Sequence, residues 1–476
     1  MEKKAHIHLI WLLSAMFLLG LLLIALLKTQ EPSLSSQVSE DHDCIDLVQV
    51  KERGHLDVSL DYNSLNYYVI NGRPTGFQFE LARYFANFLG VELHILVTND
   101  IREAVDFLKM GKTDIICTDL TIVTNRFGNA VEFSIPWAST NQLLVQNLNS
   151  KRHRPVTNIN ELSGKTIHVP RGSVFPAIIR HACRGLSPMP YIIEVPGLGS
   201  EQLIDAVADG KISYTVADFH LATYHAAIYD NIDASLVIGD DKPLGWCLRS
   251  CSSMLLDTLN LWLTEFIKSR QFGYLHYRHF VNSFKVEQYN NDFFSVKNGN
   301  ISPYDELIKK YSKEIGWDWR LIASLIYEES HFKMDLVSPS GAYGIMQLMP
   351  ETARTLGIDS ASSAEDHIKA GLKLLKGMDS RLKPFVPDDN ERIKFTLASY
   401  TLGEGHVLDA IALTEKYRKN PQIWENNVEH FLIMKGQQKY FMDKVVKYGY
   451  CKGKLASIFV RNILERYEHY KNSFPL

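Results

Sequence analysis

The 476-residue sequence has no excess of either charge, only six cysteines and a single long apolar run. Its 51 Lys and Arg residues nearly balance its 54 Asp and Glu residues, so no basic field is present to hold nucleic acid, and we expect no nucleic-acid partner. Aromatic residues make up 11% of the chain, which excludes a mostly disordered protein. At roughly 100–200 residues per domain, the length predicts two or three domains.

The long apolar run lies at the N-terminus, and because no second one follows, a polytopic membrane protein is excluded. Residues 9–27 are uncharged, Lys3 and Lys4 precede them and Lys28 follows. A positive stretch before an apolar stretch is typical of an export signal. The run is longer than most cleaved signals and just long enough to span a bilayer, so residues 1–30 fit both a signal peptide and a retained anchor. We expect the rest of the chain to be exported, with residues 31–44 as a polar linker.

The cysteines are too irregularly spaced to form a disulfide framework in a chain of this size. Their spacing also completes no zinc site, so we expect no metal. Buried free thiols are the favoured interpretation, and one bridge, such as Cys183 to Cys247 or to Cys251, is the alternative. The six are Cys44, Cys117, Cys183, Cys247, Cys251 and Cys451.

Short strand-like runs alternate with helical patterns over residues 45–285. Strands are predicted at 67–70, 93–97, 113–117, 166–169 and 214–217, and helices at 79–89, 101–110 and 202–208. Such alternation is typical of α/β architecture with a largely parallel sheet. The series occurs twice, which predicts a module of two α/β lobes with a cleft between them.

The pattern changes after residues 286–300, which are rich in Asn and Gln and which we interpret as a second linker. From residue 301 onwards apolar residues recur at helical spacing, as in Leu307, Tyr311 and Ile315. This predicts an all-α domain over residues 301–476. The predicted fold class is therefore multidomain, with a two-lobed α/β module followed by an all-α domain.

Two adjacent carboxylates, Glu328 and Glu329, end a predicted helix whose apolar face includes Leu321 and Leu325. Consecutive helical residues point about 100° apart, so one carboxylate can face a cleft while the other faces water. Burial and the negative end of the helix dipole both raise the pKa of a carboxyl group in such a place, as a general acid near neutral pH requires. A solvated pair of carboxylates is the alternative on these grounds alone.

The residues that follow form two motifs, Glu329-Ser330 with Ser338-x-x-Gly341-Ala342-x-Gly344-Ile345-Met346-Gln347, and Ala398-Ser399-Tyr400-Thr401-x-Gly403. They resemble the Slt-type lytic transglycosylases over about residues 300–470. The resemblance implies a lysozyme-like fold that cleaves the β-1,4 bond between N-acetylmuramic acid and N-acetylglucosamine in peptidoglycan glycan strands, with 1,6-anhydromuramoyl products and no cofactor. Glu329 would be the catalytic acid, Ser338, Gln347 and Tyr400 would contact substrate, and Tyr400 would hydrogen-bond Glu329.

One position departs from the family pattern, because Thr401 stands where these enzymes usually have Asn. Threonine cannot reproduce the hydrogen bonds of an amide, so we expect some substrate contact to be lost while the acid is unaffected. We interpret His331, His367 and His406 as structural residues.

The N-terminal motifs are Gly76-Phe77-Gln78-Phe79-Glu80, Thr124-Asn125-Arg126 and Val216-Ala217-Asp218. They resemble family 3 of the periplasmic solute-binding proteins, which bind amino acids between two lobes, over about residues 45–285. The resemblance implies that Arg126 binds the ligand carboxylate and Asp218 its amino group. The ligand would be an amino acid or a muropeptide, and the module would regulate without catalysing. The alternative is that both residues are ordinary surface charges.

The order of signal, solute-binding module and Slt-type domain is similar to that of the F family of membrane-bound lytic murein transglycosylases. This similarity implies membrane association, as a peripheral protein at the periplasmic face of the outer membrane, with a retained inner-membrane anchor as the alternative. Two other functions fit the same pattern. One is a solute-binding or sensor protein with an inactive lysozyme-like domain, and the other is a hydrolase on the same fold.

Overall fold

The computed structural model describes residues 44–149, 154–281, 285–359 and 361–475. The expected export signal and the linker that follows it lie outside these residues, except for Cys44. Within the described ranges no helix is both long and apolar enough to cross a membrane. The chain from Ile45 onwards forms one compact unit.

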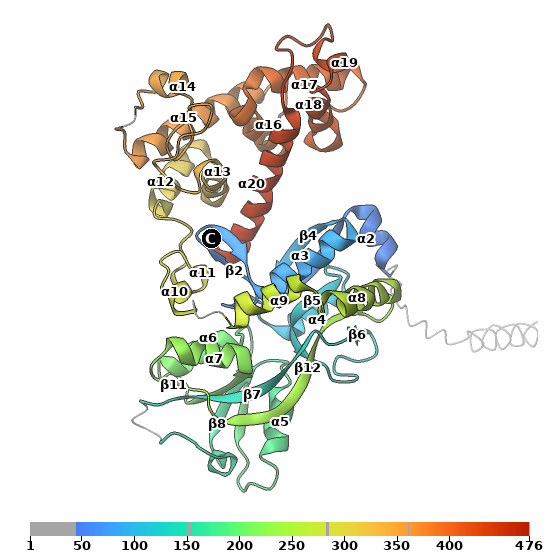
Figure 1. Cartoon of the computed structure of the whole chain (residues 1–476), viewed down its shortest axis with the longest axis vertical. Coiled ribbons are helices and arrows are strands. Elements are labelled where there is room, and N and C mark those ends of the chain that lie inside the picture. Colours follow the sequence, from blue (N-terminus) through green and yellow to red (C-terminus); the bar gives the residue numbers. More distant parts are fainter. Residues whose placement is uncertain (1–43, 150–153, 282–284, 360, 476) are drawn as a thin grey trace, which may run out of the picture. The chain divides into compact units, whose positions relative to one another are not determined.

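Ten strands of the described residues form one mixed sheet in the N-terminal half of the chain (Figure 1). β11 (Ile232–Asp233) pairs with β7, and β6 (Val131–Phe133) pairs with β12. The other eight lie in the order β4 (Glu92–Val97), β1 (His55–Leu60), β5 (Ile115–Thr121), β12 (Val237–Arg249), β7 (Ala138–Asn147), β10 (Tyr214–Asp218), β8 (Thr166–Pro170) and β9 (Tyr191–Val195).

Each end of the sheet is parallel, but its centre is antiparallel. β4, β1 and β5 run parallel at one end, and β10, β8 and β9 run parallel at the other. The two longest strands, β7 and β12, pair antiparallel with each other and with their neighbours β10 and β5. The prediction of a largely parallel sheet is therefore wrong at the centre, because β7 and β12 are long strands that join the two α/β lobes.

Helices pack on the strands of both lobes and bury apolar residues of the inner strands. In β1 the even-numbered residues Leu56, Val58 and Leu60 are buried under α3 (Phe77–Leu89) and α8 (Ser253–Phe266), as the two-residue period of a strand requires. The remaining helices of the module are α2 (Leu47–Arg53), α4 (Ile101–Lys109), η1 (Ile159–Leu162), α5 (Phe175–Ala182), α6 (Ser200–Ala208), α7 (Phe219–Ile228), α9 (Arg270–His276) and η2 (Tyr277–Val281).

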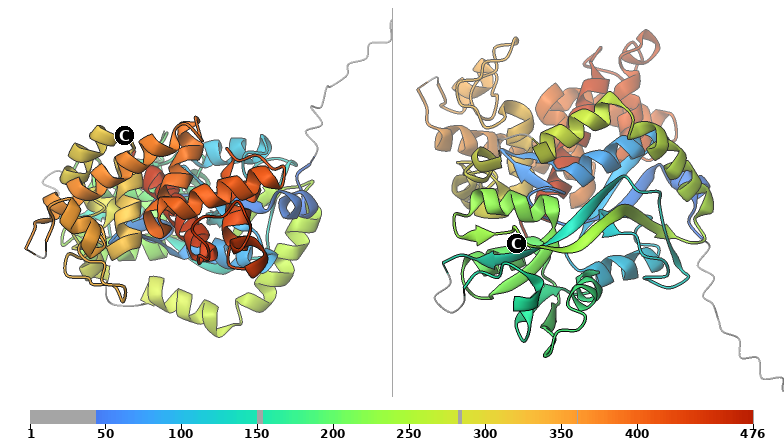
Figure 2. Two further views of the ribbon diagram at one scale, coloured as in Figure 1. Left: turned by 90° about the horizontal axis from the view of Figure 1, so that it is seen from above. Right: turned by 60° about the horizontal axis from the view of Figure 1, so that its bottom comes forward.

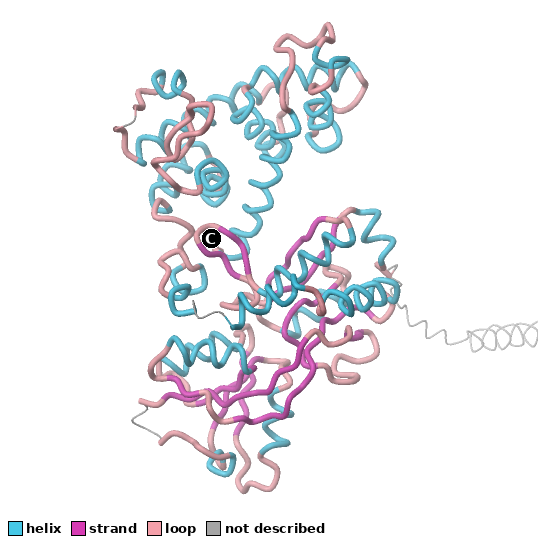
Figure 3. Tube along the Cα trace, in the orientation of Figure 1, coloured by secondary structure: helices cyan, strands magenta, loops and turns pink. Residues whose placement is uncertain are grey.

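The described residues of the C-terminal region form helices joined by loops and no named strand (Figure 3, cyan and pink). Its apolar residues form one core, which accounts for the helical spacing seen in the sequence (Figure 2, yellow to red). The helices are α12 (Asp305–Ile315), α13 (Trp319–Ser330), α14 (Pro350–Thr355), α15 (Ala364–Leu382), α16 (Asp389–Leu402), α17 (Glu404–Lys416), η3 (Trp424–Val428), α18 (Glu429–Met434), α19 (Gln438–Phe441) and α20 (Gly453–Ser473). The predicted fold class is confirmed.

The segment interpreted as a second linker contains the short helices α10 (Lys285–Tyr289) and α11 (Ser295–Asn298). Phe294 between them is fully buried, with its ring edge-on to that of Tyr68. The hydroxyl of Ser295 accepts a hydrogen bond of 2.8 Å from the Val69 backbone N–H. This segment is therefore attached to the hairpin that holds Tyr68 and Val69.

The cysteines divide into two groups. Cys117, Cys183, Cys247 and Cys451 are buried free thiols, as the favoured interpretation expects. Cys44 and Cys251 are disulfide-bonded, so the favoured interpretation is wrong for these two. The suggested bridge through Cys183 is wrong, because this thiol packs in the apolar core around β8 and α5.

A hairpin of the α/β module packs against the helical region. Its strands are β2 (Tyr68–Ile70) and β3 (Arg73–Thr75), and Gly72 in the turn has a left-handed φ of 75°. The Tyr470 hydroxyl on α20 donates a hydrogen bond of 2.8 Å to the Gly72 carbonyl. A Cβ atom on Gly72 would lie 2.7 Å from the Tyr327 ring and 2.9 Å from the Phe332 ring. The turn therefore has room for glycine alone.

Replacing Gly72 by alanine should destabilise the protein by about 2–4 kcal/mol, because left-handed strain and overpacking add. Gly128→Ala is the matched control: its φ is 80°, but no atom lies within 4 Å of a new Cβ, so only the strain of about 1–2 kcal/mol remains. Chemical unfolding of both variants measures the difference. Equal losses would show that the hairpin does not pack tightly against Tyr327 and Phe332.

Candidate active site

The helix that carries the two adjacent carboxylates, α13, is fixed at both ends. Its N-cap residue Asp318 accepts a hydrogen bond of 2.9 Å from the Arg320 backbone N–H. It ends at His331, which has a left-handed φ of 50° and whose N–H donates to the Tyr327 carbonyl at 2.9 Å. Buried apolar residues between these ends hold the helix in the core. Glu328 and Glu329 therefore occupy its last turn.

Glu328 is bound by two residues of α20. Asn462 donates to one of its oxygens and Arg466 to the other, both at 2.8 Å. The Arg466 guanidinium also lies over the Tyr327 ring, 4.4 Å from the centroid. The sequence predicts that one carboxylate of the pair faces water. This is wrong for Glu328, whose side chain is 19% exposed and fully hydrogen-bonded to α20.

Glu329 has the opposite environment. It is mostly buried, and among the described residues no hydrogen bond or ion pair reaches its carboxyl group. Burial, with the negative charge of Glu328 as a second cause, raises the pKa of Glu329 to about 8. A carboxylic acid with this pKa is protonated at neutral pH. It can therefore donate a proton to a bound molecule, whereas Glu328 cannot.

Tyr400 on α16 lies near Glu329, but its hydroxyl group binds the backbone of the neighbouring loop. Its hydroxyl donates a hydrogen bond of 2.6 Å to the Met346 carbonyl. Burial, and after it the charge of Glu329, raises the pKa of Tyr400 well above its usual range. The predicted hydrogen bond from Tyr400 to Glu329 is absent, because the hydroxyl proton is used by the loop carbonyl. Tyr400 thus fixes the loop beside the acid.

The loop of residues 338–349 carries the other two predicted substrate contacts. The Ser338 hydroxyl accepts from the Ala342 N–H at 3.0 Å, which closes a tight turn. The Gln347 amide donates to the carbonyls of Leu336 and Gly344, both at 2.9 Å. Ser338 and Gln347 therefore stabilise the loop by hydrogen bonds to its own backbone. They were predicted to contact the substrate of the acid Glu329.

Two residues that the sequence reasoning left without a role connect this site. The Ser330 hydroxyl, directly after Glu329, donates to the Ile345 carbonyl at 2.8 Å and so joins α13 to the loop. Asn462 binds Glu328 from α20. Ser330 and its partner Ile345 lie in one motif quoted from the sequence, but the partner is a backbone carbonyl; Asn462 and Glu328 lie far apart along the chain, so spacing alone identifies neither contact.

The three histidines occupy structural places. His331 caps α13, and His367 is 1% exposed, with its ring filling the space beside Gly344. His406 lies 3.1 Å from the ammonium of Lys435, which is itself buried and paired with Asp409. Thr401 is exposed on the last turn of α16.

A second candidate site is a cavity of about 90 Å³ in the α/β module, lined by residues of both lobes. Arg126 lines it, and its guanidinium donates to the Thr121 carbonyl at 3.2 Å and to the Gly172 carbonyl at 3.0 Å. Burial lowers the pKa of Arg126 to about 10, so it stays charged at neutral pH. Thr121 ends β5 and Gly172 follows β8, so one guanidinium joins the two lobes.

Asp218 lines the same cavity at the end of β10 and accepts a hydrogen bond of 3.0 Å from the Gln142 amide. Burial raises the pKa of Asp218 to about 7. The structure thus brings together Arg126 and Asp218, which lie 92 positions apart in the sequence. The alternative of two ordinary surface charges does not describe these residues.

The cavity also holds two carboxylates that the sequence reasoning missed. The Asn66 amide donates to Asp61 at 3.1 Å and to Asp119 at 3.0 Å. Burial, then the charge of Asp119, raises the pKa of Asp61 to about 7. Asp61 directly follows β1 and Asp119 lies near the end of β5, and the carboxyl ends of parallel strands are the usual place for ligand groups. A carboxylate at or near the end of a strand was therefore the signal in the sequence that could have identified both residues.

Comparison with known proteins gives two family matches. The model of the family described as transglycosylase SLT domain matches residues 306–423. The model described as bacterial extracellular solute-binding proteins, family 3, matches residues 56–282.

Solved structures similar to the N-terminal half include a variant of ArgBP from T. maritima, at 24% identity and a TM-score of 0.44, which covers 50% of this chain and 100% of that chain. The solute receptor for L-cysteine of Neisseria gonorrhoeae is 19% identical with a TM-score of 0.44, over 50% of this chain and 95% of that chain. An amino acid ABC transporter substrate-binding protein of Streptococcus pneumoniae is 19% identical with a TM-score of 0.42, over 50% and 97%.

The two family matches lie in the order in which the sheet and the helical region occur, and the SLT match contains α13 with Glu329. The chain thus combines a region that matches the family 3 solute-binding proteins with one that matches the transglycosylase SLT domain, and the SLT domain indicates a peptidoglycan lytic transglycosylase, a lyase.

Proposed function

We propose that the protein cleaves the β-1,4 bond between N-acetylmuramic acid and N-acetylglucosamine in peptidoglycan strands and releases 1,6-anhydromuramoyl products. The observation that supports this most strongly is the contrast between Glu329 and Glu328. Glu329 is unpaired and its pKa is raised to about 8, while Glu328 is bound by Arg466 and Asn462. A single positioned acid is what this reaction requires.

In the proposed mechanism the Glu329 carboxylic acid protonates the glycosidic oxygen as the bond from that oxygen to C1 of the muramic acid breaks. The resulting carboxylate then takes the proton of the C6 hydroxyl group of the same sugar. That hydroxyl oxygen attacks C1 and closes the anhydro ring, which returns Glu329 to its protonated form. Because the nucleophile is part of the substrate, neither a water molecule nor a second carboxylate is needed.

The alternative of a sensor with an inactive helical domain does not account for Glu329. A buried, unpaired carboxyl group is costly, and among the residues that the structure describes no hydrogen bond or ion pair uses it. A hydrolase on the same fold would need a carboxylate to activate water. Glu328 is not available for that role, because α20 binds both of its oxygens.

Glu329→Gln should lower the rate of product release from purified sacculi by at least about 10²–10⁴-fold, because the amide keeps the shape but donates no acidic proton. Glu328→Gln is the matched control, one residue away. It should retain the chemistry and lose stability, since Arg466 would be left without its anionic partner. If Glu328→Gln abolishes the reaction and Glu329→Gln does not, the acid has been assigned to the wrong residue.

The pH dependence of kcat/KM should follow the acid form of Glu329. Burial raises the pKa of this group, so the active protonated form persists through neutral pH and is lost as the pH rises through about 8. Above that value kcat/KM should fall about tenfold per pH unit. A fall that begins near the ordinary glutamic acid pKa of 4.5 would mean that Glu329 is not desolvated.

We also propose that the cleft of the module binds a small ligand with a carboxylate and an amino group, an amino acid or a muropeptide. Arg126 would bind the carboxylate through two parallel hydrogen bonds, and Asp218 would bind the ammonium. Support comes from their shared cavity and from the bonds of Arg126, which reach backbone carbonyls in both lobes. Ligand binding would modulate the lyase to the extent that the ligand prefers one form of the module.

Arg126→Lys should weaken binding of such a ligand at least tenfold, because lysine keeps the charge but not the planar fork. Calorimetry with a panel of amino acids and muropeptides measures this, and Arg184→Lys, an exposed arginine of the same module, serves as control. Unchanged affinity in Arg126→Lys would place the ligand elsewhere. If no member of the panel binds, the module is a spacer and not a ligand-binding domain.

For the location of this activity we propose export to the cell-wall compartment, with peripheral attachment to the periplasmic face of the outer membrane. The proposal rests on the charge and apolar character of residues 1–30 and on the peptidoglycan substrate. Fractionation of cells followed by detection of the protein tests it.

A further inference from the structure

Two histidines and one aspartate form a cluster at the edge of the sheet, on the face opposite the α3–α8 core. β4 is the edge strand, and in its parallel register with β1, Asp57 lies opposite His94 and His55 lies opposite Glu92. Side chains alternate along a strand, so these four residues share one face while Leu56 and its even-numbered neighbours point into the core. The cluster is therefore accessible from solvent.

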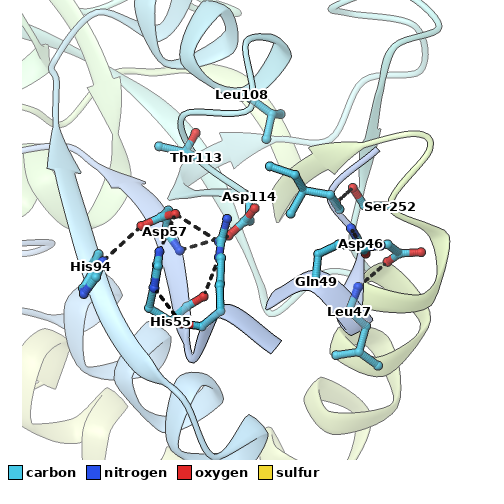
Figure 4. Close-up of polar contacts among 12 residues, drawn as sticks. Asp46, Leu47, Gln49, His55, Asp57, His94, Leu108, Thr113, Asp114 and Ser252 are labelled. Carbon is cyan, nitrogen blue, oxygen red and sulfur yellow. Dashed lines mark hydrogen bonds and ion pairs between the residues drawn. The ribbon is translucent and has the colours of Figure 1, made fainter. Parts of the chain in front are cut away.

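The three side chains already have the spacing of metal ligands. His55 Nε2 lies 3.5 Å from one oxygen of Asp57, and His94 Nδ1 lies 3.3 Å from the other (Figure 4). The three ligand atoms all lie within 4.8 Å of one another. Bonds of about 2.0–2.1 Å in a tetrahedral site separate the ligand atoms by about 3.4 Å. The two histidines approach different oxygens of Asp57 at close to this distance, and His94, with a side chain 51% exposed, can rotate towards the oxygen that faces His55.

The outer contacts of both histidines orient a ring nitrogen towards Asp57. His55 Nδ1 lies 3.2 Å from the Arg53 carbonyl, to which it donates, and this leaves the lone pair of Nε2 facing the aspartate. His94 Nε2 lies 4.0 Å from a Glu92 oxygen, while Nδ1 faces Asp57. Histidines that bind metals almost always donate their second ring N–H to a carbonyl or carboxylate in this way.

The imidazoles of His55 and His94 are stacked with centroids 4.3 Å apart, so both rings lie beside the same carboxylate. Arg53 lies 3.0 Å from the Asp57 oxygen that His55 approaches and also pairs with buried Asp114, so it holds this carboxylate in place.

We propose that His55, His94 and Asp57 bind one first-row divalent metal ion of the Zn²⁺ type. Two imidazoles and one carboxylate suit zinc and its neighbours, whereas Ca²⁺ and Mg²⁺ prefer oxygen ligands alone. The fourth position is left to water. The site is independent of the proposed cleavage reaction, which requires no metal.

The last helix of the catalytic region lies close to this cluster. Asn472 on α20 donates to the Ile95 carbonyl of β4 at 3.3 Å, one residue from His94. An ion that holds His94 against Asp57 would join β4 to β1 beside this contact. A filled site should therefore stabilise the edge of the sheet where α20 packs.

The test uses the full-length protein after treatment with a chelator, titrated with Zn²⁺ by calorimetry. Co²⁺ serves as a second probe, because tetrahedral coordination gives it a strong visible absorption. His94→Gln and His55→Gln should each weaken binding at least about 10–100-fold. His181→Gln, at an exposed histidine on α5 of the same module, is the matched control and should bind as the wild type does.

A second readout separates a specific site from scattered surface binding. Zn²⁺ should raise the thermal midpoint of the wild type and of His181→Gln but not of His94→Gln, because an ion that binds only the folded state stabilises it. Lytic activity should be the same in all of them. The proposal is overturned if the wild type binds no Zn²⁺, or if His94→Gln and His55→Gln bind it with the wild-type affinity and show the same thermal shift.

Discussion

Burial of Glu329 beside the Glu328 carboxyl group determines what Glu329 can do. Burial comes first, and the charge of Glu328 second, in raising the pKa of Glu329, while Arg466 and Asn462 bind the two oxygens of Glu328. Two chemically identical residues, adjacent on one helix, thus have opposite environments. The arrangement costs stability: the folded state binds a proton at Glu329 more tightly than the unfolded chain does, so stability declines as the pH rises from about 4.5 through about 8.

The same helix that supplies Arg466 also contacts the α/β module. Tyr470 donates to the Gly72 carbonyl, and His469 lies 3.0 Å from the Tyr67 hydroxyl. Asp61 and Asn66 in the ligand cavity directly precede the hairpin that these residues touch. Helix α20 therefore contacts Glu328, next to the acid, through Arg466, and it contacts the α/β module through His469 and Tyr470. Any ligand-dependent movement of the hairpin would reach the surroundings of Glu329 through α20.

Much of this account could be predicted from local sequence, because local signals decide local structure. The helix periodicity around Leu321 and Leu325 identified α13, and the motifs after it identified Glu329. The partners of Glu328, the acceptor of the Tyr400 hydroxyl and the two extra carboxylates Asp61 and Asp119 could not be predicted. Each depends on residues brought together from distant parts of the chain, and several partners are backbone carbonyls, which carry no sequence signal. The antiparallel centre of the sheet could not be predicted for the same reason, because pairing between distant residues sets the direction of each strand.

The most direct test of the central claim is the pKa of Glu329 itself, followed by the ¹³C chemical shift of its labelled side-chain carboxyl group over a pH titration. We predict a midpoint near 8 in the wild type, because burial and the charge of Glu328 both disfavour the carboxylate. In Glu328→Gln the midpoint should move down, since the neighbouring charge is removed. A wild-type midpoint near 4.5, unchanged in Glu328→Gln, would contradict the account.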